Sequence, residues 1–109
     1  MTKYINDETF SDEVVSSDKP VMVDFTANWC PPCKVVSPIV DRLATEFDGK
    51  VKVLKLDIDT APEVVKEFGV KSIPTFIFFQ SGKEVDRWLG AGKNESAFRE
   101  KLNSLSETK

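Results

Sequence analysis

The chain has 109 residues, 40% hydrophobic and 30% charged, as expected of a folded globular protein, and we predict one domain over residues 1–109. Its formal net charge of −3 excludes the basic surface with which proteins bind nucleic acid. It contains no histidine, which excludes Cys-His and Ser-His nucleophile pairs and imidazole metal sites.

The first part of the chain alternates strand and helix patterns. Tyr4–Ile5 predicts a short edge strand, and Asn6 or Asp7 can cap the helix expected after it. Val21–Thr26 is apolar and β-branched except for Asp24, which is typical of a central strand covered on both faces. From this pattern alone, Asp24 would be an exposed residue at a strand edge.

A helix is expected from Pro32 onward, because apolar residues recur with helical spacing. These residues are Val36, Val40, Leu43 and Phe47. Gly49 suits a left-handed cap at the end of this helix. Val51–Ile58 then alternates as an inner strand does, and from the pattern alone Lys55 could equally be a solvated lysine on a half-exposed strand.

A short helix, two strands and a final helix are expected in the last part of the chain. Pro62 opens the short helix and Gly69 closes it. Phe76–Phe79 predicts an aromatic core strand, and Ser81-Gly82 predicts a tight turn into a strand over Glu84–Leu89. The apolar stripe of the final helix consists of Phe98, Leu102 and Leu105.

These elements follow one another in the order β-α-β-α-β-α-β-β-α. Strands that alternate with helices imply a parallel section, and the hairpin near the end of the chain adds antiparallel strands. We therefore predict an α/β fold in which a mixed, five-stranded central sheet has helices on both faces.

Both cysteines lie in one segment, Trp29-Cys30-Pro31-Pro32-Cys33-Lys34, between the central strand and the helix. A Cys-x-x-Cys pair in a strand–turn–helix setting is typical of a redox motif. The helix N-terminus favours a thiolate at Cys30, so Cys30 is the expected nucleophile and Cys33 the resolving thiol. A structural disulfide or an inert buried pair is the weaker interpretation. Two cysteines cannot supply a four-thiolate site, and we expect no bound metal.

The N-terminal segment has no apolar run and becomes acidic at Asp7 and Glu8, so it does not have the pattern of a secretory signal. No later apolar run is long enough to span a membrane. We therefore expect a cytoplasmic monomer with neither membrane nor nucleic-acid partners. The mature form of an organellar protein would have the same sequence features.

The ordered motifs of this chain resemble the thioredoxin family from Tyr4 to Leu105. They are Val23-Asp24-Phe25, Trp29-Cys30-Pro31-Pro32-Cys33-Lys34, Pro38, Lys55-Leu56-Asp57-Ile58-Asp59, Ile73-Pro74-Thr75 and Gly90-Ala91. The family commonly has glycine at the position of Pro31. The Cys-Pro-Pro-Cys form is similar to a variant of some plant cytosolic thioredoxins, tryparedoxins and nucleoredoxins, and the surrounding residues resemble those of the plant h-type. The resemblance implies the thioredoxin fold.

The resemblance also implies a role for individual residues. Asp24 would lie buried beneath the cysteines and relay the proton of Cys33, and Lys55 would approach Asp24 from the paired strand. The peptide bond between Ile73 and Pro74 would be cis. The residues expected to contact the substrate are Trp29, Pro31, Pro32, Ile73, Pro74, Gly90 and Ala91.

The function that the resemblance implies is reduction of disulfide-containing target proteins through a mixed disulfide. The chain has no glycine-rich nucleotide loop, so no bound cofactor is expected. Electrons would come from a thioredoxin reductase-like partner that carries flavin and NADPH or is linked to ferredoxin. Three alternatives are an oxidant or isomerase, a binding scaffold that ignores thiol state, and a copper or zinc carrier. The absence of histidine between the cysteines argues against the first.

Overall fold

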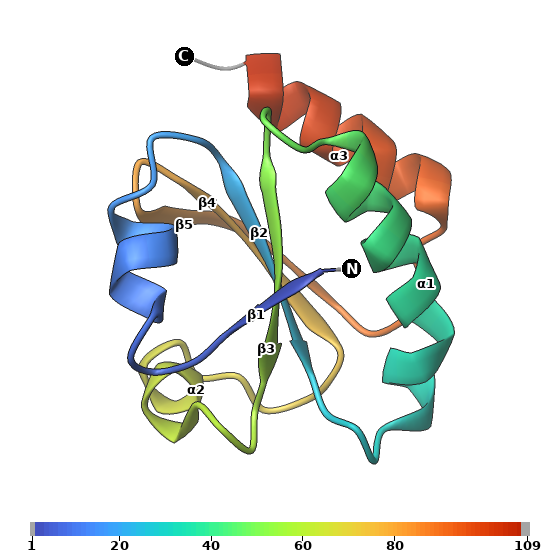
Figure 1. The fold of residues 1–109 in the computed structure, drawn as a ribbon. Helices are drawn as coiled ribbons and strands as arrows, with labels where there is room; N and C mark the ends of the chain where they lie inside the picture. The colour runs from blue at the N-terminus through green and yellow to red at the C-terminus, as the bar shows by residue number, and fades with distance from the viewer. Residues whose placement is uncertain (1, 108–109) are drawn as a thin grey trace.

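Five strands form one mixed sheet in the computed structural model, which describes residues 2–107 (Figure 1). In chain order they are β1 (Lys3–Ile5), β2 (Val21–Thr26), β3 (Lys52–Asp57), β4 (Thr75–Gln80) and β5 (Lys83–Leu89). Their order across the sheet is β1-β3-β2-β4-β5. β3 pairs in parallel with β1 and β2, whereas β4 runs antiparallel to β2 and β5. The predicted α/β class and mixed five-stranded sheet are confirmed.

Helices cover both faces of the sheet, as expected (Figure 1). The π-helix η1 (Ser11–Val15) and the helix α2 (Pro62–Glu67) lie on one face. The helices α1 (Pro31–Glu46) and α3 (Glu95–Glu107) lie on the other. α1 begins one residue earlier than the predicted start at Pro32, because proline is also accommodated at the first helical position, where its missing N–H leaves no bond unmade.

Each central strand sends alternate side chains into two separate cores. On β2, Val23 and Phe25 pack with the residues beneath η1 and α2, while Met22 packs beneath α1 and α3. This alternation places Asp24 on the α1 and α3 side of the sheet. The predicted aromatic core strand is confirmed, since the side chains of Phe76–Phe79 are all buried.

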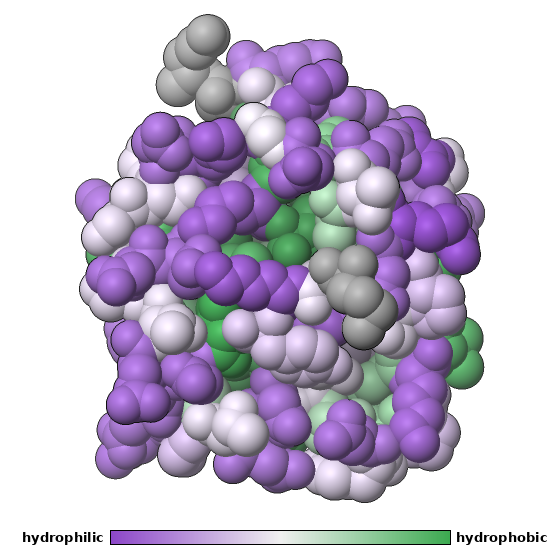
Figure 2. Space-filling model, viewed as in Figure 1, coloured by the Kyte–Doolittle hydropathy of each residue, from purple (hydrophilic) through white to green (hydrophobic). Residues whose placement is uncertain are grey.

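Aromatic contacts join the sheet to α3. The ring of Phe98 lies 4.8 Å from that of Phe76 and 5.3 Å from that of Trp88, measured between centroids. Trp88 also packs edge-on against Phe78 at 5.0 Å. Such pairs contribute about 0.5–1.5 kcal/mol each beyond the area that they bury. On the face seen in Figure 2, hydrophilic residues cover most of the surface and hydrophobic ones show through between them.

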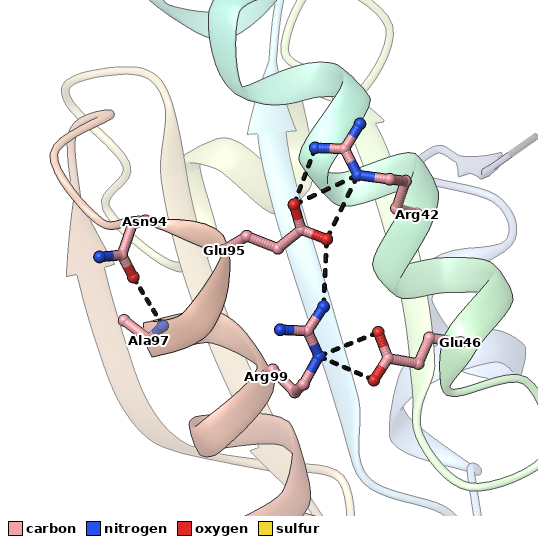
Figure 3. Close-up of polar contacts among 6 residues, drawn as sticks. All are labelled: Arg42, Glu46, Asn94, Glu95, Ala97 and Arg99. Carbon is pink, nitrogen blue, oxygen red and sulfur yellow. Dashed lines mark hydrogen bonds and ion pairs between the residues drawn. The ribbon is translucent and has the colours of Figure 1, made fainter.

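A chain of ion pairs joins α1 to α3 on the outside of the molecule (Figure 3). Glu95 accepts hydrogen bonds from Arg42 at 2.8 Å and from Arg99 at 3.2 Å. Arg99 in turn donates to Glu46 at 2.8 Å. Because solvent screens these exposed charges, the pairs add little to the stability of the fold.

Side chains outside α3 and α2 cap the first turns of these two helices. Asn94 accepts the N–H of Ala97 at 2.8 Å in the first turn of α3 (Figure 3). Asp7 accepts the N–H groups of Glu63 at 3.1 Å and Val64 at 2.9 Å, and so caps α2 from a distant part of the chain. Asp7, one of the two residues predicted to cap the first helix, therefore caps α2 instead.

Asn6, the other predicted cap, does not cap η1 either, because the N-cap residue of η1 is Phe10 and no side chain within residues 2–107 caps it. Its side-chain oxygen accepts the N–H groups of Glu8 at 3.0 Å and Thr9 at 3.1 Å, directly before η1. An Asx turn of this kind orders the chain as it leaves β1. Consequently Asp7, the next residue, is free to reach α2.

Candidate active site

The two cysteines lie at the start of α1, directly after the loop that leaves β2. Cys30 is the N-cap residue, and its sulfur accepts the N–H of Cys33 at 3.3 Å. The two residues form a disulfide whose Cα atoms are 5.3 Å apart. Pro31 and Pro32 occupy the first helical turn, where backbone N–H groups have no partner within the helix.

The disulfide is almost covered by protein. The exposed fraction is 4% for Cys30 and 2% for Cys33. Ala27, Ile58 and Ile73 pack against the pair, and the carbonyl oxygen of Ile73 lies 4.0 Å from the sulfur of Cys30. A low-dielectric wall of this kind strengthens the effect of any nearby charge on the sulfurs.

The loop before β4 lies beside the disulfide in the expected conformation. The peptide bond between Ile73 and Pro74 is cis. The N–H of Gly90 donates to the carbonyl oxygen of Pro74 at 2.8 Å, which holds the end of β5 against this loop. The structure therefore brings Ile73, Pro74 and Gly90 together near Cys30, and Ala91 follows Gly90 in the chain.

The residues expected to contact the substrate differ in exposure. Trp29 has 63% of its surface exposed, and its indole N–H donates to Asp59 at 2.9 Å. Pro31 and Pro32 are also exposed, and Ile73, Gly90 and Ala91 are half-buried. Pro74 is buried and presents little surface. A cleft of about 120 Å³ lies between Trp29 and Ile73, with Ile58 in its wall.

Asp24 is buried, as the resemblance implied and the sequence pattern alone did not. Its exposed fraction is 1%, and its Oδ1 atom has no hydrogen-bond partner among residues 2–107. Its neighbours in the sheet are Lys55 on β3 and Phe76 on β4. Desolvation raises the pKa of Asp24 to about 7, against the lowering effect of the Lys55 charge and with a further rise from the Asp41 charge.

Lys55 is buried beside Asp24 in register, with an exposed fraction of 5%. Its ammonium group donates to Ser37 Oγ at 2.6 Å and lies 3.0 Å from Asp41 Oδ1. Within residues 2–107, the ion pair of Lys55 is therefore with Asp41 and not with Asp24. Lys55 is thus next to Asp24 in the sheet, and its charge lowers the pKa of Asp24, as expected. Its ammonium group, however, turns toward α1.

Sequence reasoning missed Ser37 and Asp41, which surround the Lys55 ammonium. Thr2 also donates a hydrogen bond to Asp41 from the start of the chain. The available signal was their spacing: Ser37 and Asp41 are four residues apart, so they share one face of α1. They directly follow Val36 and Val40 in the chain, so this polar face borders the apolar stripe.

Within residues 2–107, no group of three or more His, Cys, Asp or Glu side chains is placed to hold a metal ion. No helix in that part of the chain has the length and apolar character needed to cross a membrane.

Comparison with known proteins places the chain in one family. The family model described as Thioredoxin matches residues 1–104. The chain is 47% identical to "Thioredoxin 1" of Nostoc sp. over 87 residues, which cover 80% of this chain and 81% of that protein. It is 45% identical to "Thioredoxin" of Rickettsia felis over 96 residues, which cover 88% of this chain and 91% of that protein.

A third relative is much longer. The chain is 46% identical over 105 residues to "Bifunctional thioredoxin reductase/thioredoxin" of Mycobacterium leprae, which covers 96% of this chain and 23% of that protein. The likeness of the active-site surroundings to plant h-type forms stays a prediction.

The family model matches nearly the whole chain, and the cysteine pair is bonded at the start of α1. The chain therefore belongs to the thioredoxin family of thiol–disulfide oxidoreductases.

Proposed function

We propose that this chain reduces disulfide bonds in target proteins, with Cys30 as the nucleophile. The observation that carries the proposal is the position of the Cys30 sulfur at the start of α1, where it accepts the N–H of Cys33 at 3.3 Å. In the reduced protein, this N–H and the positive end of the helix dipole would stabilise a thiolate at Cys30. The thiolate is the form of cysteine that attacks a disulfide.

The reaction consists of two exchanges. The Cys30 thiolate attacks one sulfur of the target disulfide, which forms a mixed disulfide and releases the other target sulfur as a thiolate. Cys33 then loses its proton and attacks the Cys30 sulfur, which releases the second target sulfur. Two electrons pass from the dithiol to the target, and Cys30 and Cys33 end as the disulfide seen in the structure.

Asp24 is the proposed acceptor of the Cys33 proton. Its burial on the α1 side of the sheet supports this role, as does its pKa of about 7, because both protonation states are then populated near neutral pH. Lys55 is proposed to adjust this pKa through its positive charge.

An apolar rim around the cysteines is proposed to bind extended, disulfide-bearing segments. The exposed Trp29 and the half-buried Ile73 support this role, because they leave apolar surface next to the covered disulfide. The proposed substrate-binding residues are Trp29, Pro31, Pro32, Ile73, Pro74, Gly90 and Ala91.

Electrons are proposed to come from a thioredoxin reductase-like partner that carries flavin and NADPH or is linked to ferredoxin, with no cofactor held by this chain. The relative from Mycobacterium leprae supports a reductase partner, because its name joins a thioredoxin reductase to a thioredoxin. We further propose a cytoplasmic monomer in which residues 1–109 act as one domain.

A Cys33→Ser variant tests the nucleophile directly. With a peptide that contains one disulfide, this variant should accumulate a covalent one-to-one adduct through Cys30, because the resolving thiol is missing. Mass spectrometry of the intact protein detects the adduct. Reduced wild-type protein should instead release both peptide thiols, and Cys30→Ser should form no adduct. An adduct of Cys30→Ser at the same rate would contradict the assignment, and failure of the wild-type protein to reduce the peptide would contradict the function.

A further inference from the structure

The ammonium group of Lys55 is buried and has two partners, both on α1. Ser37 Oγ accepts its hydrogen bond at 2.6 Å, and Asp41 Oδ1 lies 3.0 Å away. Only 6% of the Lys55 side chain is exposed, whereas 38% of the Asp41 side chain is. A buried ammonium is costly without partners, so these two contacts largely determine where the charge lies.

Asp24 is the competing partner for this ammonium. Asp24 and Lys55 are direct neighbours on the parallel strands β2 and β3, and both side chains lie on the side of the sheet that faces α1. Adjacent strands are about 4.8 Å apart, and the lysine stem is long and flexible enough to turn toward either carboxylate. In the structure the ammonium turns to Asp41, and no atom in the described part of the chain forms a hydrogen bond with Asp24 Oδ1.

The other groups around this site come from every element that packs on it. From the edge strand β1, the Tyr4 ring lies 5.9 Å from the Lys55 ammonium, and Thr2 donates to Asp41. From β4, the neighbour of Asp24 is the apolar Phe76, whose outer side packs on Phe98 of α3. The charged groups that act on Asp24 are Lys55 and Asp41. Cys30 and Cys33 are disulfide-bonded and do not titrate in this state.

We propose that Ser37 and Asp41 are positioning residues that hold the Lys55 ammonium on α1 and thereby keep Asp24 without a counter-ion. This inference rests on the proposed role of Asp24 as the proton acceptor for Cys33. A carboxylate in a close ion pair would be a weaker base, because a neighbouring cation stabilises its charged form. Ser37 and Asp41 thus leave Asp24 able to take up a proton near neutral pH.

The two positioning residues act in distinguishable ways. Asp41 carries a negative charge that itself raises the pKa of Asp24, so its loss has a direct effect as well as the effect of freeing Lys55. Ser37 is uncharged, so its loss acts only by freeing the ammonium. Ser37→Ala is therefore the cleaner variant, and Ser37→Thr is the conservative one that keeps a hydroxyl group.

The test is the titration of the Asp24 carboxyl carbon, followed by ¹³C NMR in the oxidised protein, in which the cysteines do not titrate. Ser37→Ala and Asp41→Asn should each lower the midpoint by about one pH unit, since an approaching cation has an effect of that size. Ser37→Thr should restore the wild-type midpoint. In a Lys55→Met background, Ser37→Ala should have no effect.

Glu46→Gln is the matched control, because it removes one negative charge from α1 without touching Lys55. It should leave the Asp24 midpoint unchanged. An unchanged midpoint in Ser37→Ala, or an equal fall in the Lys55→Met background, would overturn the proposal. Because Ser37→Ala and Asp41→Asn preserve side-chain size closely, folding is checked by comparing their unfolding curves with that of the wild-type protein.

A kinetic readout separates this proposal from the function on which it rests. The rate at which Cys33 resolves a preformed mixed disulfide is measured against pH in the same variants. If Asp24 is the proton acceptor, the acidic limb of this profile should move down with the NMR midpoint. A midpoint that moves while the limb does not would support the placement of Lys55 by Ser37 and Asp41 and contradict the role of Asp24.

Discussion

Asp24 shows how one buried side chain links the fold to the chemistry. The alternation of β2 directs it to the α1 side of the sheet, where water is excluded and Oδ1 finds no partner. Desolvation is the main cause of its raised pKa, and Lys55 opposes this only from a distance because its ammonium is held by Ser37 and Asp41. The fold therefore buries a residue that weakens it when charged, at the position proposed for the proton acceptor.

This burial predicts how stability depends on pH. The native pKa of Asp24 is about 7, whereas an unfolded chain has the ordinary value near 3.8. Between these values the native state binds the proton that the unfolded state has released, so stability falls as pH rises through this range. The total loss is about 4 kcal/mol at the upper end.

Asp24→Asn should lack this loss. The free energy of unfolding is measured with denaturant on oxidised protein from pH 4 to pH 8. The difference between Asp24→Asn and wild type should grow in favour of the variant as pH rises to about 7, and should then be constant. Asp48→Asn, which removes an exposed carboxylate at the end of α1, is the control and should follow the wild-type curve. A constant difference between Asp24→Asn and wild type across the range would contradict the burial of a titrating Asp24.

At the scale of elements, the sequence predicted most of the fold because its signals are local. Apolar spacing identified the strands and α1, and glycine and proline marked helix ends. It could not predict that Asp7 caps α2, because that contact spans 56 residues to Glu63. Nor could it predict the partners of Lys55, because Ser37 and Asp41 come within reach of this long side chain only when α1 packs on the sheet.

The Asp7 cap makes an element-scale prediction. Asp7→Ala should lower the free energy of unfolding by about 0.5–2 kcal/mol, because two N–H groups at the start of α2 lose their acceptor. Hydrogen exchange should quicken at Glu63 and Val64 more than in α1 or α3. The neighbouring exposed residue Glu8 provides the control, and Glu8→Ala should change neither quantity. Unchanged exchange at Glu63 and Val64 in Asp7→Ala would show that the cap does not order α2.

At the scale of the whole molecule, the residues around the disulfide come from segments at one end of the central strands β2, β3 and β4. The carboxyl end of β2 leads to Cys30, the residue after β3 supplies Ile58, and the loop before β4 supplies Ile73 and Pro74. Sequence motifs predicted roles for Cys30 and Pro74, because a Cys-x-x-Cys pair and a proline next to it in the fold have chemical properties that few other residues share. Ile58 lies in one of the quoted motifs, but no role could be assigned to it from the sequence, because an isoleucine beside a disulfide has the same local pattern as one in any core.

The measurement that tests the proposed direction of electron flow most directly is the equilibrium reduction potential of Cys30 and Cys33. It is obtained by titration against a defined thiol couple, with tryptophan fluorescence as the readout. We predict a single two-electron couple near the value known for thioredoxins, about −270 mV, as expected of a reductase. A potential near that of protein disulfide isomerases, about −180 mV, or the absence of a reversible couple would contradict the account.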